Sequence, residues 1–202
     1  MFIRKGQLPI FITNLLILAG FASYYISRLN YEFILYIGVI IFFLAVFVAT
    51  NHKIYYPNFV LWGLTLWALM HMAGGSVHIS GVLLYKIMII PLGETIPVFR
   101  FDQLVHIIGF GVATMTLYYV LKPLLKPDSK SIWALSIVLV CAGLGIGALN
   151  EIIEFIATLL VPQTGVGGYL NTALDLCANL IGAVLATIII LKVNKNNVVI
   201  IK

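Results

Sequence analysis

The sequence predicts an all-α integral membrane protein, a six-transmembrane-helix bundle with a partly apolar outer segment between helices three and four. Of its 202 residues, 62% are hydrophobic and only 9% are charged. Because average soluble chains carry about 25% charged residues, this composition excludes an ordinary water-exposed domain. The net charge is +5, yet the basic residues stand singly between apolar runs. The lipid bilayer is therefore the expected partner, and no nucleic-acid partner is expected.

The charged residues divide the chain into helix-sized segments. Four charge-free runs contain 22, 20, 19 and 20 residues, close to the roughly 20 residues that one helix needs to cross a ~30 Å hydrocarbon core. An apolar run after Pro57 predicts the third helix, and the run from Asp175 to Lys192 predicts the sixth. The whole chain, 1–202, is expected to form a single polytopic membrane domain with helices at 8–28, 32–51, 57–74, 102–122, 131–160 and 171–192.

The loops between these spans differ in basic charge. Nine Lys and Arg residues fall on the side of the two termini and three on the other side, so the positive-inside rule predicts a cell-membrane protein with cytoplasmic N and C termini. A signal peptide is the competing interpretation of residues 1–27, but five further spans favour a retained signal anchor. Residues 75–101 are mostly apolar and contain Pro91 and Pro97, which indicates an interfacial or re-entrant segment on the outer face.

Ionisable side chains gather at the outer ends of four predicted helices. Ionisable groups near a bilayer are costly and indicate a functional site. Asp102 and His106 are four residues apart and share a helix face. Asp175 lies about 26 Å from Lys192 along its helix, so it is expected just inside the outer boundary, with His106 as its partner. The residues at these ends are His71, His78, Asp102, His106, Glu151, Glu154 and Asp175.

Small and polar residues follow helical steps on the last two spans. Residues 143, 147, 150, 151 and 154 form one stripe, and residues 171, 175, 179, 182 and 186 form another. Glycines in such stripes let neighbouring helices approach closely. We therefore expect both stripes to face the inside of the bundle.

Several stretches resemble known membrane families. RFDQLVHIIGFG, NEIIEF and GGYLNTALDLCANLIGA look like the YjdF-like family of bacterial inner-membrane proteins, and DLCANLIGAVLA is similar to the D-x3-N-x2-G signature of VanZ-like proteins. With HMAGG at His71, the resemblance covers roughly residues 68–188. Where the family pattern has an Asp-Thr pair, this chain has Asn171-Thr172. YjdF-like proteins have no established activity to carry over, and VanZ-like proteins are associated with glycopeptide tolerance.

One hypothesis for the gathered residues is a metal-dependent enzyme. Imidazole and carboxylate ligands suit Zn, Mn or Fe, and an open position on such an ion would activate water or polarise a phosphoryl or acyl oxygen. A site at headgroup level would then act on a lipid or a lipid-linked envelope intermediate. The candidate metal ligands are His71, His106, Glu154 and Asp175. Asp102 and Glu151 are the candidate catalytic residues, each also a possible ligand. The candidate supporting or substrate-binding residues are Arg100, Asn150, Asn171 and Asn179.

Two other hypotheses stay open on the sequence alone. The polar residues could form a structural network that fixes helix packing. They could also line an ion or proton path, although the inner halves of the last three helices carry no Asp, Glu, His, Lys or Arg. His78 is weaker as a site residue, and Glu32 is expected to be a solvated loop charge. The first two helices are expected to be scaffold or a surface for a partner.

Overall fold

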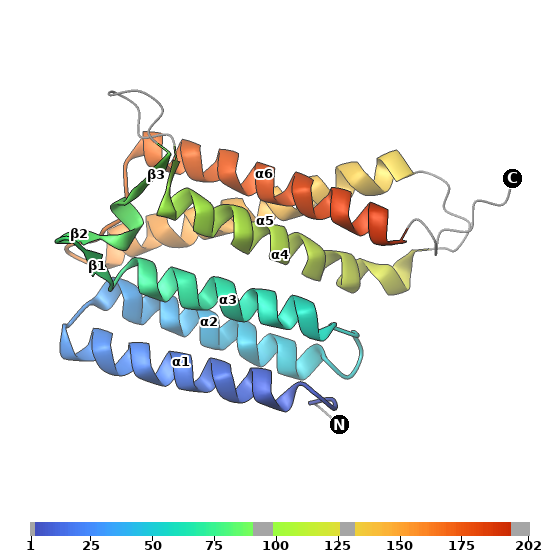
Figure 1. The fold of residues 1–202 in the computed structure, drawn as a ribbon, viewed down its shortest axis with the longest axis horizontal. Helices are drawn as coiled ribbons and strands as arrows, with labels where there is room; N and C mark the ends of the chain where they lie inside the picture. The colour runs from blue at the N-terminus through green and yellow to red at the C-terminus, as the bar shows by residue number, and fades with distance from the viewer. Residues whose placement is uncertain (1–2, 91–98, 126–131, 195–202) are drawn as a thin grey trace, which may run out of the picture.

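The computed structural model describes residues 3–90, 99–125 and 132–194. Most of these residues are helical, and five helices are long and apolar enough to cross a membrane. The third, with 17 residues, is shorter than these five. The helices are α1 (Leu8–Ser27), α2 (Tyr31–Thr50), α3 (Asn58–Gly74), α4 (Phe101–Leu121), α5 (Ile132–Leu160) and α6 (Tyr169–Asn194) (Figure 1).

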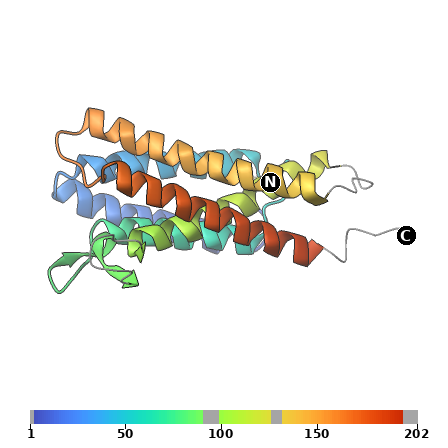
Figure 2. The ribbon, with the colours of Figure 1, turned by 90° about the horizontal axis from the view of Figure 1, so that it is seen from above.

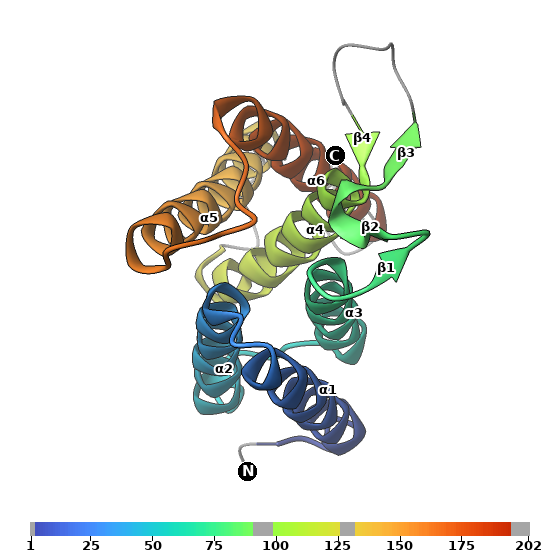
Figure 3. The same cartoon turned by 90° about the vertical axis from the view of Figure 1, so that its left-hand side faces the viewer.

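The helices lie side by side, with their axes along the length of the molecule (Figures 1 and 2). Seen from the end, α4 lies in the middle, with α1, α2 and α3 on one side and α5 and α6 on the other (Figure 3). α1 begins and α6 ends at the same end of the bundle. The opposite end carries the short strands, and we call it the strand end.

Short local signals fix several helix starts. The Asn30 side chain accepts a hydrogen bond of 3.1 Å from the Phe33 amide and caps α2. α3 starts directly after Pro57, as the sequence predicts. At the start of α4, the Gln103 side-chain oxygen accepts a hydrogen bond of 2.9 Å from the Arg100 amide. This bond satisfies one of the backbone donors that a helix start leaves free.

The segment between α3 and α4 contains strands that the sequence analysis did not predict. β1 (His78–Ile79) pairs antiparallel with β2 (Val82–Leu83). The two turn residues between them, Ser80 and Gly81, both have positive φ, as a two-residue hairpin with a type I′ turn requires. A 3-10 turn, Leu84–Lys86, leads to β3 (Met88–Ile90), which pairs with β4 (Phe99–Arg100). Pro91 and Pro97 lie outside the described residues, as do the basic residues at 126, 130, 195 and 202.

The predicted small-residue stripes face neighbouring helices. A Cβ atom added to Gly111 of α4 would lie 3.3 Å from the Gly182 carbonyl oxygen of α6. On α5, Gly143 packs against Thr114 of α4 and Ala183 of α6. The absence of side chains at these positions brings the three helix backbones close together. α4, α5 and α6 therefore form a tightly packed unit.

Large side chains pack the other half of the molecule. Tyr25, Phe33, Tyr36 and Met72 of α1, α2 and α3 form a buried cluster near the strand end. Glu32 lies next to this cluster and is buried, with 7% exposure. The prediction of a solvated loop charge at Glu32 was therefore wrong, because the side chain turns inward and finds hydrogen-bond donors there.

Candidate functional site

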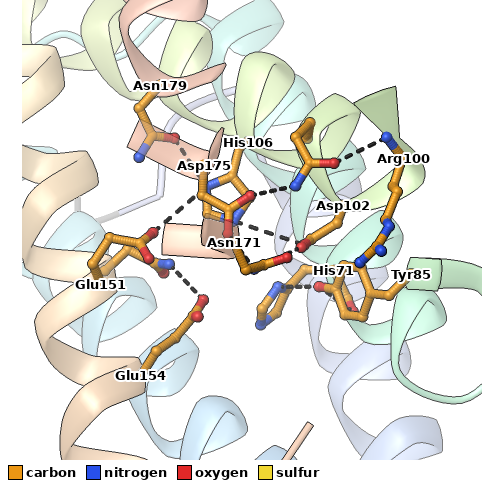
Figure 4. Close-up of polar contacts among 12 residues, drawn as sticks. His71, Tyr85, Arg100, Asp102, His106, Glu151, Glu154, Asn171, Asp175 and Asn179 are labelled. Atoms are coloured by element: carbon orange, nitrogen blue, oxygen red, sulfur yellow. Dashed lines mark hydrogen bonds and ion pairs between the residues drawn. The ribbon is translucent and has the colours of Figure 1, made fainter. Parts of the chain in front are cut away.

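The ionisable residues of α4, α5 and α6 meet near the strand end of the bundle (Figure 4). The first turns of α4 contribute Asp102 and His106, and the last third of α5 contributes Glu151 and Glu154. The start of α6 contributes Asp175. These five residues come from three helices that the glycine contacts hold close together, so their positions are set by the packed backbone.

His106 lies at the centre of the cluster. Its Nδ1 atom is 2.9 Å from the Asn179 side-chain oxygen, and its Nε2 atom is 3.8 Å from Asp102 Oδ1. When Nδ1 carries the proton and donates to Asn179, Nε2 keeps a free lone pair on the side of Asp102. A hydrogen bond at one ring nitrogen that leaves the other free is the usual arrangement of a metal-binding histidine.

Asp175 is fully buried and well supplied with hydrogen bonds. Gln103 Nε2 donates to its Oδ1 atom at 2.6 Å, and Asn171 Nδ2 donates to its Oδ2 atom at 2.5 Å. Asn171 also donates to Asp102 Oδ2 at 3.3 Å. The sequence analysis expected His106 as the partner of Asp175. The hydrogen-bond partners are instead two amides, while His106 lies in the same cluster.

Two groups of residues have ligand atoms close enough to share an ion. Asp102, His106 and Asp175 form one group, and His106, Glu151 and Glu154 form the other; within each, the ligand atoms lie within 4.8 Å of one another. The second group faces His106 Nδ1, which is 3.8 Å from Glu151 Oε1 and already bonded to Asn179. In the first group, Asp102 lies on the side of the free Nε2 atom, so this group is the better ligand set.

The two glutamates of α5 differ in their hydrogen bonds. Asn150 Nδ2 donates to Glu154 Oε1 at 2.9 Å. Glu151 Oε1 is buried and has no hydrogen-bond partner within the described part of the chain, and the same holds for Asn179 Nδ2. A buried polar atom without a partner is costly unless a ligand or water satisfies it. Glu151 is therefore the carboxylate most available to a bound group.

His71 of α3 lies beside the cluster but belongs to neither group. Its Nδ1 atom is 2.5 Å from the Tyr85 hydroxyl oxygen, and that hydroxyl donates to the His71 carbonyl oxygen at 3.0 Å. Burial raises the pKa of Tyr85 above its ordinary value of 10.0, so the hydroxyl keeps its proton. Trp67 stacks on the His71 ring with 5.6 Å between ring centres. Arg100, also a candidate, lies near Tyr85 at the start of α4 (Figure 4).

Sequence reasoning missed two buried residues of this region. Gln103 is 2% exposed and binds Asp175. Its signal was its position three residues before His106, which places both on one helix face. Glu32 of α2 accepts hydrogen bonds from the Gly165 amide at 2.6 Å and the Tyr36 hydroxyl at 3.3 Å. Nothing in the sequence near Glu32 indicated the contact with the α5–α6 loop.

Together, the fold and the cluster define a multi-pass helical membrane protein with buried acids and imidazoles at one end. The chain belongs to the family described as predicted membrane protein (DUF2238), whose sequence model matches residues 8–196. No curated protein and no solved structure matches the chain. Family membership confirms the membrane class, and the roles of individual residues rest on the geometry described above.

Proposed function

We propose that this protein crosses the membrane six times, with both termini in the cytoplasm, and is a metal-dependent enzyme of the outer face. In this proposal Asp102, His106 and Asp175 hold a divalent Zn, Mn or Fe ion. The substrate is a lipid or a lipid-linked envelope intermediate, which the depth of the cluster within an apolar bundle favours. Such an ion would activate water or polarise a phosphoryl or acyl oxygen. We also propose that the resemblance to YjdF-like and VanZ-like proteins reflects this shared site.

The observation that carries the proposal is that amide side chains hold the candidate ligands in place by hydrogen bonds. Asn179 orients His106, and Gln103 and Asn171 hold both oxygens of Asp175. Metal-binding residues commonly have such hydrogen-bonded partners. Packing alone needs few polar contacts, because one such bond between membrane helices contributes only ~0.6 kcal/mol on average. Several buried carboxylates also favour a cation that compensates their charge.

The remaining residues then take supporting roles. Glu151, with an unpartnered buried oxygen, would exchange a proton with the substrate or with water. Asn150 holds Glu154 beside it. Arg100 would bind a phosphate oxygen of the substrate, since Arg suits bidentate contacts with phosphate. His71 has Nδ1 bound to Tyr85 and Nε2 available as a further contact. Compared with the sequence hypothesis, Asp102 joins the ligand set, while His71 and Glu154 leave it and lie beside it.

Metal analysis of purified protein tests the proposal. We expect about one equivalent of a transition metal after purification in a mild detergent without chelator, and a loss of most of it in His106→Ala. The matched control is His78→Ala, because His78 is exposed on β1 and lies outside both groups. A folded wild-type protein free of metal, or a His106→Ala variant with unchanged metal content, contradicts the proposal.

A structural network is the second candidate function, and the dense amide contacts of Asp175 favour it. It predicts that His106→Ala lowers thermal stability while neither the variant nor the wild type contains metal. An ion path instead predicts flux across liposome membranes that depends on Glu151 or Asp175. The metal content therefore separates the enzyme from both alternatives.

A further inference from the structure

A cavity of about 330 Å³ lies between α1, α2 and α3 on one side and α4 and α5 on the other. Its volume falls in the range of small-molecule sites. Amide side chains in its wall already have hydrogen-bond partners within the protein. Asn51 donates to Gln7 at 2.6 Å, and Asn14 donates to Thr65 at 2.7 Å. Most of the wall is aliphatic or aromatic, with Ile10, Ile40, Leu64, Phe110, Leu117 and Ile146 among the lining residues.

At one end, the cavity is lined by two aromatic residues that contact histidines of the candidate site. Trp67 and Phe110 line the cavity. Trp67 also stacks on His71, and the Phe110 ring centre is 5.5 Å from that of His106. The opposite end lies at Gln7, Asn51 and Tyr56, far from the strand end. The wall between the two ends is therefore mostly apolar, and the ionisable cluster lies near one end only.

The length and cross-section of the cavity limit the shape of a molecule that can fill it. The lining residues of α4 run from Gly109 to Val120, a length of ~16 Å at 1.5 Å per residue. This is about the hydrocarbon thickness of one membrane leaflet, half of ~30 Å. The volume of about 330 Å³ counts the positions open to the centre of a water molecule, so with the ~1.4 Å water radius added the free cross-section over that length is roughly 50 Å². An α-helix about 10 Å wide needs about 80 Å², so another protein helix does not fit, whereas one extended hydrocarbon chain does.

We propose that this cavity binds one hydrocarbon chain of a lipid, whose polar head lies at the Asp102, His106 and Asp175 cluster. Protein interiors leave few voids larger than a water molecule, and this cavity offers almost no free polar group to hold water. A bilayer supplies hydrocarbon chains at high concentration. The inference rests on the proposed function for the position of the head, and it names the substrate class as a lipid with at least one unbranched or isoprenoid tail.

Photocrosslinking in vesicles tests the proposal. The protein is reconstituted into phosphatidylethanolamine and phosphatidylglycerol vesicles that contain a phospholipid with a diazirine on one acyl chain. Labelled residues are then mapped by peptide mass spectrometry. We expect a diazirine near the chain end to label Leu117 and Val120, and one near the head to label Phe110. Label on exposed Phe42, which faces bulk lipid, is the internal reference.

Two substitutions on the same helix provide a matched pair. Leu64 lines the cavity, whereas Leu66 is 48% exposed on the outside of α3. Leu64→Trp should fill the cavity and reduce the labelling of Phe110 and Leu117 at least fivefold relative to Phe42, while Leu66→Trp should leave it unchanged. Ala113→Phe, from the opposite wall, should act like Leu64→Trp and serves as the second blocking variant.

The outcomes separate this inference from the proposed function. Label confined to exposed residues, or cavity label that neither blocking variant reduces, overturns the bound chain. A reversed order of labelling, with the chain end near Phe110, overturns the position of the head. Metal content is measured on the same samples: a metal-free protein with the expected, blockable label refutes the metal centre and supports the chain in the cavity.

Discussion

The two halves of this bundle are packed in opposite ways. α4, α5 and α6 approach through glycines, with Gly111 and Gly182 almost in backbone contact. α1, α2 and α3 meet α4 and α5 through large side chains, and a cavity of about 330 Å³ remains between them. The polar cluster lies between α4, α5 and α6, and the cavity borders α1, α2 and α3. Backbone contact fixes positions more firmly than side-chain contact does. The close-packed helices α4, α5 and α6 therefore suit residues that hold an ion, and the looser packing around the cavity suits a lipid chain that exchanges with the bilayer.

The largest effect is expected where the close contact is broken. A side chain at Gly182 would meet the Ile107 carbonyl oxygen and would lie 2.9 Å from the Gly111 nitrogen. These are backbone atoms of the central helix and have no room to move. Gly182→Leu should therefore cost about 3 kcal/mol or more, the upper range for overpacking. Thermal unfolding in detergent, followed by light scattering or gel filtration, measures the loss.

Gly38 of α2 is the matched control for Gly182, because a side chain there would meet no atom within 4 Å. Gly38→Leu should leave stability unchanged or raise it by up to about 0.8 kcal/mol, since Leu favours helix more than Gly does. Equal losses at the two positions would show that the loss at Gly182 does not come from contact with the backbone of α4.

Removal of metal should produce the next largest loss of stability. This loss should depend only on the ligand residues of α4 and α6. A ligand present at 100 times its dissociation constant stabilises a protein by about 2.7 kcal/mol. For a chain of this size that corresponds to a shift in unfolding temperature of roughly 5–10 °C. A strong chelator should lower the unfolding temperature of wild-type protein by this amount.

Asp175→Asn keeps the shape of the side chain but removes its charge, and it should abolish the chelator effect. Without a metal, the same substitution should lower stability, because one of the two acceptor oxygens becomes an amide NH2 that faces the donor of Gln103 or Asn171. The chelator effect in His78→Ala should match that in wild type. A chelator effect that persists in Asp175→Asn would exclude this carboxylate as a ligand.

Local spacing made part of the site predictable. Asp102 and His106 are separated by four positions in the sequence, and Asp102 Oδ1 lies 3.8 Å from His106 Nε2. Asn171 likewise donates a hydrogen bond to Asp175 across one helical turn. The glycine stripes also follow from helical steps. The charge-free runs of 19 to 22 residues indicate membrane helices for the same reason, since length and hydropathy are properties of a single segment.

Contacts between distant segments were not predictable. Gln103 and Asp175 are 72 residues apart, and Glu32 and Gly165 are 133 apart. Only the relative rotation and depth of two helices decide such pairs, and no periodicity within one helix encodes them. Glu32 was misplaced for this reason, because its own neighbours indicate a helix start at the membrane surface.

The smallest effect concerns the single described hydrogen bond between α2 and the α5–α6 loop. Glu32 accepts the Gly165 amide at 2.6 Å, and bonds to charged groups contribute about 1.5–3 kcal/mol. Glu32→Gln keeps an acceptor but removes the charge, so it should cost about half of that value. Hydrogen exchange at residues 161–168 should accelerate severalfold. Tyr36→Phe, which removes the other donor to Glu32 without touching the loop, should leave that exchange unchanged. If both variants accelerate exchange equally, the two halves are held together by the packing around Glu32 and not by its bond to the loop.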